Sequence, residues 1–498
     1  MRLLVGALLL LLGAVSARAE SDIELLNATL VAKFHFAEEA PDGQMVGAYQ
    51  VSFRNIGDTP VSKISLLLNP GLQFDKVVGP GGKTLKLTSR VASATGMRPL
   101  ELNVAEVTLP KSLRKGESRL EIVVHYRGYL QDLSQTGLVG VKETLHPDFT
   151  MIRAQSFGYP VFADADRLSI QEAWTHKPFY QVAFLDVPGL NSVVGNLKIA
   201  QKTTDGDITK FEMKSEQPTG LMTLAIGPYK FMPQPAASLA YMTMDQSSAA
   251  AVAVSLEREI SSLSNILGPL PNSKHLTIAE IPDGFKHPRD TGLALLTLDQ
   301  INVPDLAQKT GRVHPIEDNT DDIFQANGVT GHLSEGFVRS NLIDLWRLNP
   351  RGKQDHWAVG IDRYLQIRLN EEVALPHLRK GAYRSVREFA SKDPMFSKTP
   401  LTEYAVEGFD SKINTVSTLT FNVLDELLGR DEFFALVRSM RADLSVGYAD
   451  MQSVADHLDM HIKDKKARKF ANNWFQKGRI GKDMAKAGSF EELVALYR

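Results

Sequence analysis

The sequence contains no cysteine. This absence excludes disulfide bridges, thiolate zinc sites, a cysteine nucleophile and a lipid anchor on cysteine. Neither charge sign is in clear excess, because 56 Lys and Arg stand against 58 Asp and Glu, so the charge does not indicate nucleic acid or an anionic membrane surface as a partner. With 498 residues, of which 43% are hydrophobic, the chain can instead bury sizeable cores in two or more domains.

Long hydrophobic runs are missing after the N-terminus, where no segment reaches the roughly 18 uninterrupted apolar residues of a membrane-spanning helix. The first segment, MRLLVGALLLLLGAVSARAE, combines Arg2, an apolar run over residues 3–15 and a small-residue site that ends at Ala19. The alternative, an uncleaved membrane anchor, is disfavoured because this run is short for a bilayer span. We expect a signal peptide over residues 1–19 and a periplasmic or secreted mature protein without a stable membrane span.

Two patterns divide the rest of the chain. Residues 20–232 contain short alternating runs such as MVGAYQVSFRNIG and SRLEIVVHYRGYL, separated by Gly, Pro, Asn and Asp, which is typical of β-strands and turns. Residues 233–498 contain mainly helical patterns, such as SSAAAVAVSLEREISSLSNILG and STLTFNVLDELLG. We therefore predict an α+β protein, with an N-terminal all-β sandwich-like domain over 20–232 and a mostly helical domain over 233–498.

One helical segment, GHLSEGF, carries a candidate metal ligand. A helix that binds catalytic zinc usually offers two His residues four apart, with a Glu directly after the first as general base. Here Leu333 follows His332 and Gly336 stands at the second-ligand position, so the pattern supplies neither the base nor a second imidazole. Glu335 occupies neither of these positions. The plain alternative is that His332 is a packed, hydrogen-bonded histidine.

The order of the segments resembles that of the aminopeptidase N-like zinc metallopeptidases, the gluzincins in which a β domain precedes a thermolysin-like domain. PFYQVAFLDVPGLNSVVGNLKIA and SEQPTGLMTLAIGPYKFM are similar to strands of the β domain of that family. ISSLSNILGPLPNSKHLTIAEIPDGF resembles the helix, turn and strand before the family's Gly-Ala-Met-Glu-Asn substrate loop, and HWAVGIDRY and ARKFANNWFQKGRI resemble later helices. The resemblance covers residues 22–483 and implies a thermolysin-like fold for the helical domain.

The same resemblance places most of the family's functional positions on residues of the wrong chemistry. It implies that only the first zinc ligand keeps its type. The correspondences are His332 for the first ligand, Leu333 for the general base, Gly336 for the second ligand, Val359 for the third ligand, Arg289 for the Glu that binds a free amino terminus, and Asp410 for the transition-state Tyr.

We therefore expect a non-catalytic aminopeptidase-like protein without a cofactor, which binds a peptide or envelope protein through the inter-domain cleft or the β domain. The candidate cleft residues are Arg289, Glu335, His356 and Asp362. The alternative is an active zinc metallopeptidase with a rebuilt metal site, in which zinc would be held by residues among His332, Glu335, His356, Asp362, Asp321 and Asp322.

Three other stretches of the sequence have spacings or residue types that bear on catalysis or metal binding. His457 and His461 stand four residues apart in HLDMH, but the surrounding residues predict a solvated helix face instead of a metal site. No Gly-x-Ser-x-Gly elbow is present, which argues against a serine hydrolase of the α/β type. GPGGKTL lies between two predicted strands and is interpreted as a hairpin turn, not as a phosphate-binding loop.

Overall fold

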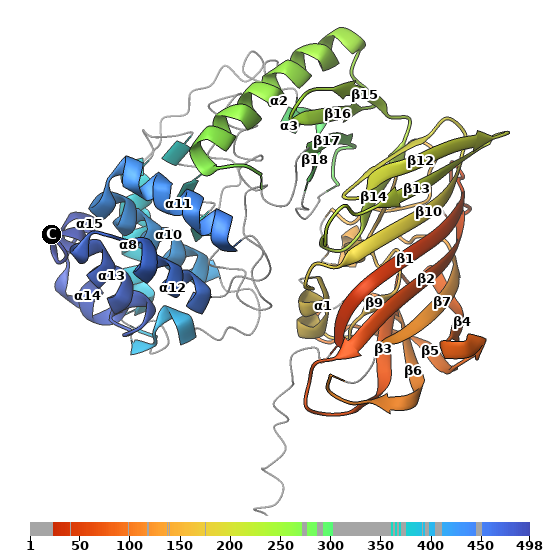
Figure 1. Ribbon diagram of the computed structural model, residues 1–498, viewed down its shortest axis with the longest axis horizontal. Coiled ribbons are helices and arrows are strands. Elements are labelled where there is room, and N and C mark those ends of the chain that lie inside the picture. The colour runs from red at the N-terminus through yellow and green to blue at the C-terminus, as the bar shows by residue number, and fades with distance from the viewer. Residues whose placement is uncertain are drawn as a thin grey trace, which may run out of the picture.

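The computed structural model describes residues 23–301 with short gaps, the pairs 360–361, 364–365 and 368–369, and residues 375–498 with short gaps (Figure 1). The signal peptide predicted over residues 1–19 lies outside this range. Strands fill the first part of the described chain and helices the last part, which confirms the predicted α+β class. Among the described helices, none is long and apolar enough to cross a membrane.

The N-terminal part consists of three sheets and one short helix. Their bounds are β1 (Ile23–His35), β2 (Gln44–Asn55), β3 (Val61–Leu68), β4 (Leu72–Val78), β5 (Lys86–Ser93), β6 (Glu101–Leu113), β7 (Leu120–Gly128), β8 (Thr150–Arg153), β9 (Val161–Phe162), α1 (Arg167–Trp174), β10 (Tyr180–Pro188), β11 (Ser192–Gly195), β12 (Lys198–Asp205), β13 (Ile208–Lys214) and β14 (Thr223–Gly227). The sheet orders are β12-β13-β10-β1-β2-β7-β4, β5-β6-β3-β9 and β11-β14-β8.

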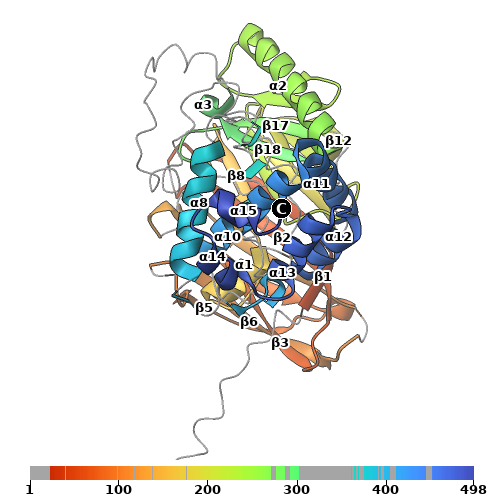
Figure 2. The ribbon, with the colours of Figure 1, turned by 90° about the vertical axis from the view of Figure 1, so that its left-hand side faces the viewer.

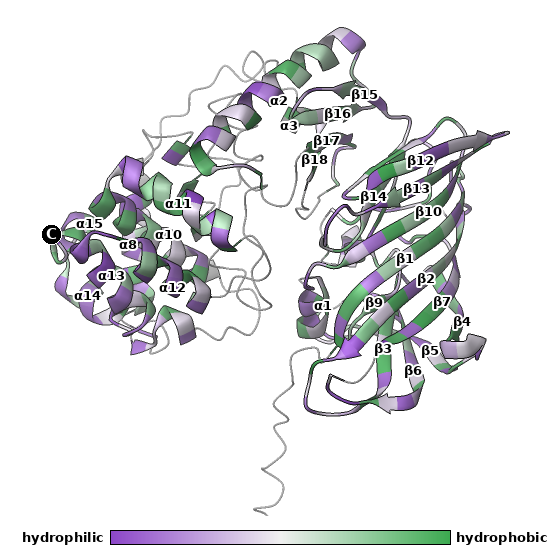
Figure 3. Ribbon diagram, in the orientation of Figure 1, coloured by the Kyte–Doolittle hydropathy of each residue, from purple (hydrophilic) through white to green (hydrophobic). Residues whose placement is uncertain are grey.

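The seven-stranded and four-stranded sheets enclose one core, which confirms the predicted sandwich-like domain. Along β2 the buried side chains alternate with exposed ones, and Figure 3 shows the same alternation of hydropathy along neighbouring strands. Phe53 on β2 lies 5.4 Å from Phe162 on β9, measured between ring centroids. The predicted turn in GPGGKTL is also confirmed, because Val78 bridges to Thr84 across it.

A second, smaller sheet follows, with one long helix. It contains β15 (Lys230–Pro233), β16 (Ala237–Tyr241), β17 (Leu276–Ile281) and β18 (Leu293–Thr297) in that order, with α2 (Gln246–Leu267) and α3 (Leu298–Ile301). Helix α2 begins where the Asp245 carboxylate accepts hydrogen bonds from the Ser247 and Ser248 amides, and it ends at Gly268, whose φ is +87°. The pairs β16–β17 and β17–β18 are parallel.

This second sheet is buried on both faces, as parallel sheets usually are. Leu293 and Leu295 of β18 belong to a cluster that includes Met151 and Ala225 from the three-stranded sheet of the β domain. Leu296, on the opposite face, belongs to the core that α2 shares with the C-terminal helices. The sheet therefore joins the β domain to the helical part (Figure 1).

The C-terminal part is a group of helices around one buried helix. The bounds are α8 (Leu375–Ala390), α10 (Ser411–Leu428), α11 (Arg430–Leu444), α12 (Met451–His461), α13 (Lys465–Phe475), α14 (Ile480–Lys486) and α15 (Phe490–Ala495). Residues 416–425 of α10 are all buried, because α8, α11, α13 and α15 pack around it. Figure 2 looks at this helical side of the molecule and shows α8 and α12 on opposite flanks of the group.

Candidate functional site

The residues predicted for catalysis, zinc binding, a rebuilt metal site and the cleft all fall outside the described part of the chain. Their predicted roles therefore stay predictions. They are Arg289, Asp321, Asp322, His332, Leu333, Glu335, Gly336, His356, Val359, Asp362 and Asp410.

Two described segments next to these positions pack tightly against each other. A Cβ added to Gly360, the residue after Val359, would lie 2.5 Å from the Asn414 carbonyl oxygen and 2.5 Å from Ser417 Cβ. The Thr418 hydroxyl lies 3.1 Å from the Gly360 carbonyl oxygen and 2.8 Å from the Asn414 carbonyl oxygen, and both oxygens accept from it. Because both contacts lie on α10, only a glycine permits this close approach of the segment to the helix.

A buried carboxylate strengthens the same junction. The Asp425 side chain on α10 is 2% exposed and accepts hydrogen bonds from the Tyr364 hydroxyl and, at 2.8 Å, from Arg368 Nε. Arg379 Nη2 on α8 lies 3.9 Å from the same oxygen. Burial, and after it the Asp425 carboxylate, raise the pKa of Tyr364, so the phenol stays protonated and donates. The cluster ties Tyr364 and Arg368 to α8 and α10.

The outer edge of β18 offers main-chain hydrogen-bonding groups. The Thr277 amide donates to the Gly292 carbonyl oxygen at 2.9 Å, at the start of the parallel ladder between β17 and β18. In this register the amide and carbonyl groups of Leu293 and Leu295 point away from β17. Among the described residues, no strand pairs with that edge.

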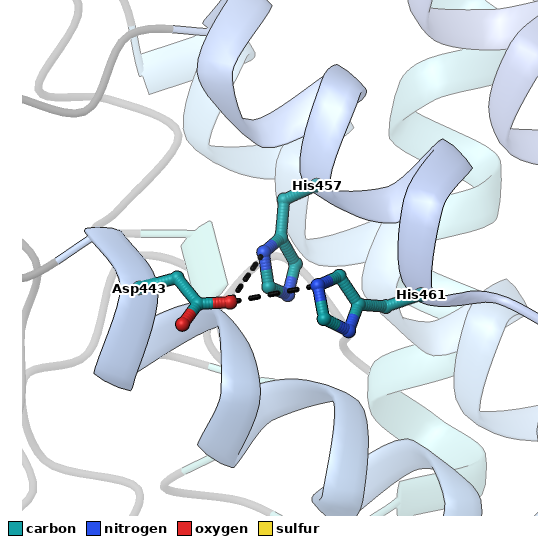
Figure 4. Close-up of side chains that lie close together, drawn as sticks. All are labelled: Asp443, His457 and His461. Atoms are coloured by element: carbon teal, nitrogen blue, oxygen red, sulfur yellow. Dashed lines mark ion pairs between the residues drawn. The ribbon is translucent and has the colours of Figure 1, made fainter.

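Three potential metal ligands meet between α11 and α12 (Figure 4). Asp443 Oδ2 lies 3.4 Å from His457 Nδ1 and 3.5 Å from His461 Nε2. The two imidazole rings stack, with their centroids 4.1 Å apart and their planes 14° from parallel. This pairing follows from the i, i+4 spacing of the two histidines, which places both on one side of α12.

A serine on α11 fixes the orientation of the His457 ring. The Ser439 hydroxyl lies 3.0 Å from His457 Nε2 and 3.0 Å from the Leu436 carbonyl oxygen. The hydroxyl has one proton, which it donates either to the Leu436 carbonyl oxygen or to Nε2, so the tautomer of His457 decides the direction of this hydrogen bond. When Nε2–H donates to Ser439, Nδ1 presents its lone pair to Asp443.

The prediction that His457 lies on a solvated helix face is wrong. Its side chain is 4% exposed, whereas those of His461 and Asp443 are 36% and 54% exposed. Burial, and then the neighbouring His461, lower the pKa of His457, although Asp443 acts in the opposite direction. The neutral imidazole that results is the form that binds metal ions.

Comparison with known proteins identifies the fold. No protein-family model and no curated protein matches the sequence. Among solved structures, the M1 zinc metallopeptidase of Deinococcus radiodurans matches with a TM-score of 0.55 and 14% identity, over 91% of this chain and 93% of that chain. A Glu-to-Ala variant of it bound to the substrate Tyr-Ser-Ala matches with a TM-score of 0.55 and 15% identity, over 92% and 95% of the two chains. The chain therefore has an aminopeptidase N-like metallopeptidase fold.

The prediction of no cofactor needs correction, because the solved structures with this fold are zinc metallopeptidases. Zinc, the alternative named above, is the ion that the fold implies. Within the described residues, one group fits its requirements: Asp443, His457 and His461 supply a carboxylate and two imidazoles. The sequence pattern indicated the two histidines but missed Asp443, which comes from a different helix.

Proposed function

We propose that this protein is an exported peptidase-like protein that binds an extended peptide or a segment of an envelope protein without hydrolysing it. The proposal rests on Leu333, which the sequence resemblance assigns to the general-base position, in a chain that matches metallopeptidase structures over 92% of its length. A leucine side chain cannot take a proton from an attacking water, whatever ion is bound. Arg289 adds a second obstacle, because its charge repels the free amino terminus of an aminopeptidase substrate.

Peptide binding itself requires none of the replaced groups. The edge of β18 can pair with an extended peptide through the main-chain groups of Leu293 and Leu295, as in other cases of β-strand addition. The two leucine side chains are buried against the β domain, so the edge strand is held rigidly for such pairing. The signal peptide predicted over residues 1–19 would bring the protein to the compartment of envelope and secreted proteins.

The first test is hydrolysis of Tyr-Ser-Ala, the tripeptide bound by the variant of similar fold. We expect the purified protein, assayed with added Zn²⁺, to release no tyrosine above the rate without protein, because position 333 offers no base. Chromatographic detection of free tyrosine checks this result. Zinc-dependent release that His332→Ala abolishes would instead establish the competing function, an active zinc peptidase with a rebuilt site.

The second test concerns the edge strand. Leu295→Pro and Leu295→Ala both remove the leucine side chain, but only proline also removes the amide that points away from β17. We expect Tyr-Ser-Ala, or a longer peptide with this N-terminus, to bind Leu295→Pro about tenfold more weakly than Leu295→Ala, the equivalent of ~1.4 kcal/mol for a main-chain hydrogen bond. Calorimetry measures both affinities, and circular dichroism checks that both variants are folded. Equal affinities would show that the edge is not the binding surface.

A further inference from the structure

We propose that Asp443, His457 and His461 form a binding site for a divalent transition metal, with zinc as its first candidate. The site joins α11 to α12 and is far in sequence from His332, the one residue of ligand type in the helix predicted there. It does not depend on the function proposed above, since neither peptide binding at β18 nor the residue at position 333 enters the argument.

The distances from Asp443 to the two histidines match those around a bound ion. Zinc binds imidazole nitrogen and carboxylate oxygen at about 2.0–2.1 Å, so two ligand atoms in a tetrahedral site lie about 3.3 Å apart. Asp443 Oδ2 lies 3.4 Å from His457 Nδ1 and 3.5 Å from His461 Nε2. One ligand atom from each of the three residues lies within 4.8 Å of the others. The remaining adjustment is a rotation of the His461 ring, which is 36% exposed, out of its stack with His457.

The contact between Ser439 and His457 supports the geometric argument. The Ser439 hydroxyl lies 3.0 Å from His457 Nε2 and holds the ring with Nδ1 facing Asp443 Oδ2 at 3.4 Å. In the tautomer that carries its proton on Nε2, the Nδ1 lone pair is available to an ion between the ring and the carboxylate. Ser439 then orients the ligand from behind, as outer hydrogen-bond partners do in metal sites.

The surroundings also suit an ion. The exposed side chains of Asp443 and His461 give it a path from solvent, while buried His457 provides a fixed anchor. Three protein ligands leave one position for water. Two imidazoles with one carboxylate favour zinc, copper, nickel or cobalt over magnesium or calcium, which prefer oxygen ligands.

Titration of the metal-free protein with Zn²⁺ and Co²⁺ tests the site. We expect one ion per chain, an absorption band of bound Co²⁺ in the visible range, and a rise in melting temperature with Zn²⁺. His461→Ala and Asp443→Asn should each weaken zinc at least tenfold. The matched control is Asp459→Asn, which removes an exposed carboxylate between the two histidines on the same helix and should leave the affinity unchanged.

A positioning variant and a second control complete the test. Ser439→Ala keeps all three ligands and should weaken zinc by about 10–100-fold, the usual effect of an outer-shell partner. His332→Ala should leave the ion in place. The proposal is overturned if zinc binds His461→Ala as tightly as the unmodified protein, if the ion is lost in His332→Ala alone, or if no ion binds. The tyrosine-release assay reports on the proposed function separately from each of these outcomes.

Discussion

Replacing Glu143 with alanine should lower the free energy of unfolding by ~3–5 kcal/mol, because a buried charge then loses its counter-ion. The side chains of Glu143 and Arg153 are 0% and 1% exposed, and Arg153 Nε donates to the Glu143 carboxylate. Arg153 Nη2 also donates to the Gly140 carbonyl oxygen at 3.0 Å, so the guanidinium is held in place without the carboxylate. Urea denaturation followed by circular dichroism measures the loss.

An exposed ion pair in the same domain provides the control. Lys63 and Glu106 lie on paired strands with side chains 56% and 52% exposed, so Glu106→Ala should cost no more than ~1 kcal/mol. Replacing both buried partners, as Glu143→Leu with Arg153→Met, should recover much of the loss, because no isolated charge remains. Equal costs for Glu143→Ala and Glu106→Ala would contradict the burial argument.

This ion pair lies close to the junction with the second sheet. Arg153 is the last residue of β8, and Met151 on the same strand packs in the cluster that contains Leu293 and Leu295 of β18. Loss of the pair therefore affects the strand that supports the proposed peptide-binding edge. Weaker peptide binding by Glu143→Ala than by Glu106→Ala would connect the two regions.

Sequence patterns predicted the strands in which apolar and polar residues alternate and the helices that have capping residues at their ends. β2 alternates between buried and exposed residues, and α2 has Asp245 and Gly268 at its ends, so both could be located without a structure. In contrast, β18 reads LALLT and is buried on both faces. Such a run has no period-2 signal, because neither face is polar, and it was not predicted. The predicted boundary at residue 232 falls within β15, which pairs with β16.

The site shows a different limit of sequence reasoning. Spacing indicated that His457 and His461 share one side of a helix, but their charged neighbours suggested solvent exposure. A stronger signal was present, since His457 adjoins Leu458 and follows Val454 by three residues, on the buried face of α12. The contributions of Asp443 and Ser439 depend on how α11 packs on α12, and no local pattern contains that information.

Asp425→Ala should produce a second loss of ~3–5 kcal/mol, because the Arg368 guanidinium and the buried Tyr364 phenol lose their common acceptor and Arg379 loses a nearby counter-charge. The side chains of Arg368 and Arg379 are 10% and 20% exposed. Water can therefore solvate their guanidinium groups only in part once the carboxylate is removed. Asp425→Asn should cost less, since its amide oxygen still accepts from Tyr364. The control is Glu426→Ala at the next position, where the side chain is 32% exposed and the expected loss is ~1 kcal/mol or less.

The Asp425 cluster also bears on the predicted active site, because it holds the segment that begins at Gly360. Val359 and Asp362, assigned to a ligand position and to the cleft, stand beside that residue in the sequence. If the segment contributes to peptide binding, Asp425→Ala should weaken Tyr-Ser-Ala under conditions where the variant remains folded, and Glu426→Ala should not. Calorimetry at low temperature tests this, and unchanged affinity in a folded Asp425→Ala would restrict peptide binding to the β18 edge. Zinc affinity should be equal in both variants, because the Asp443 site lies on other helices.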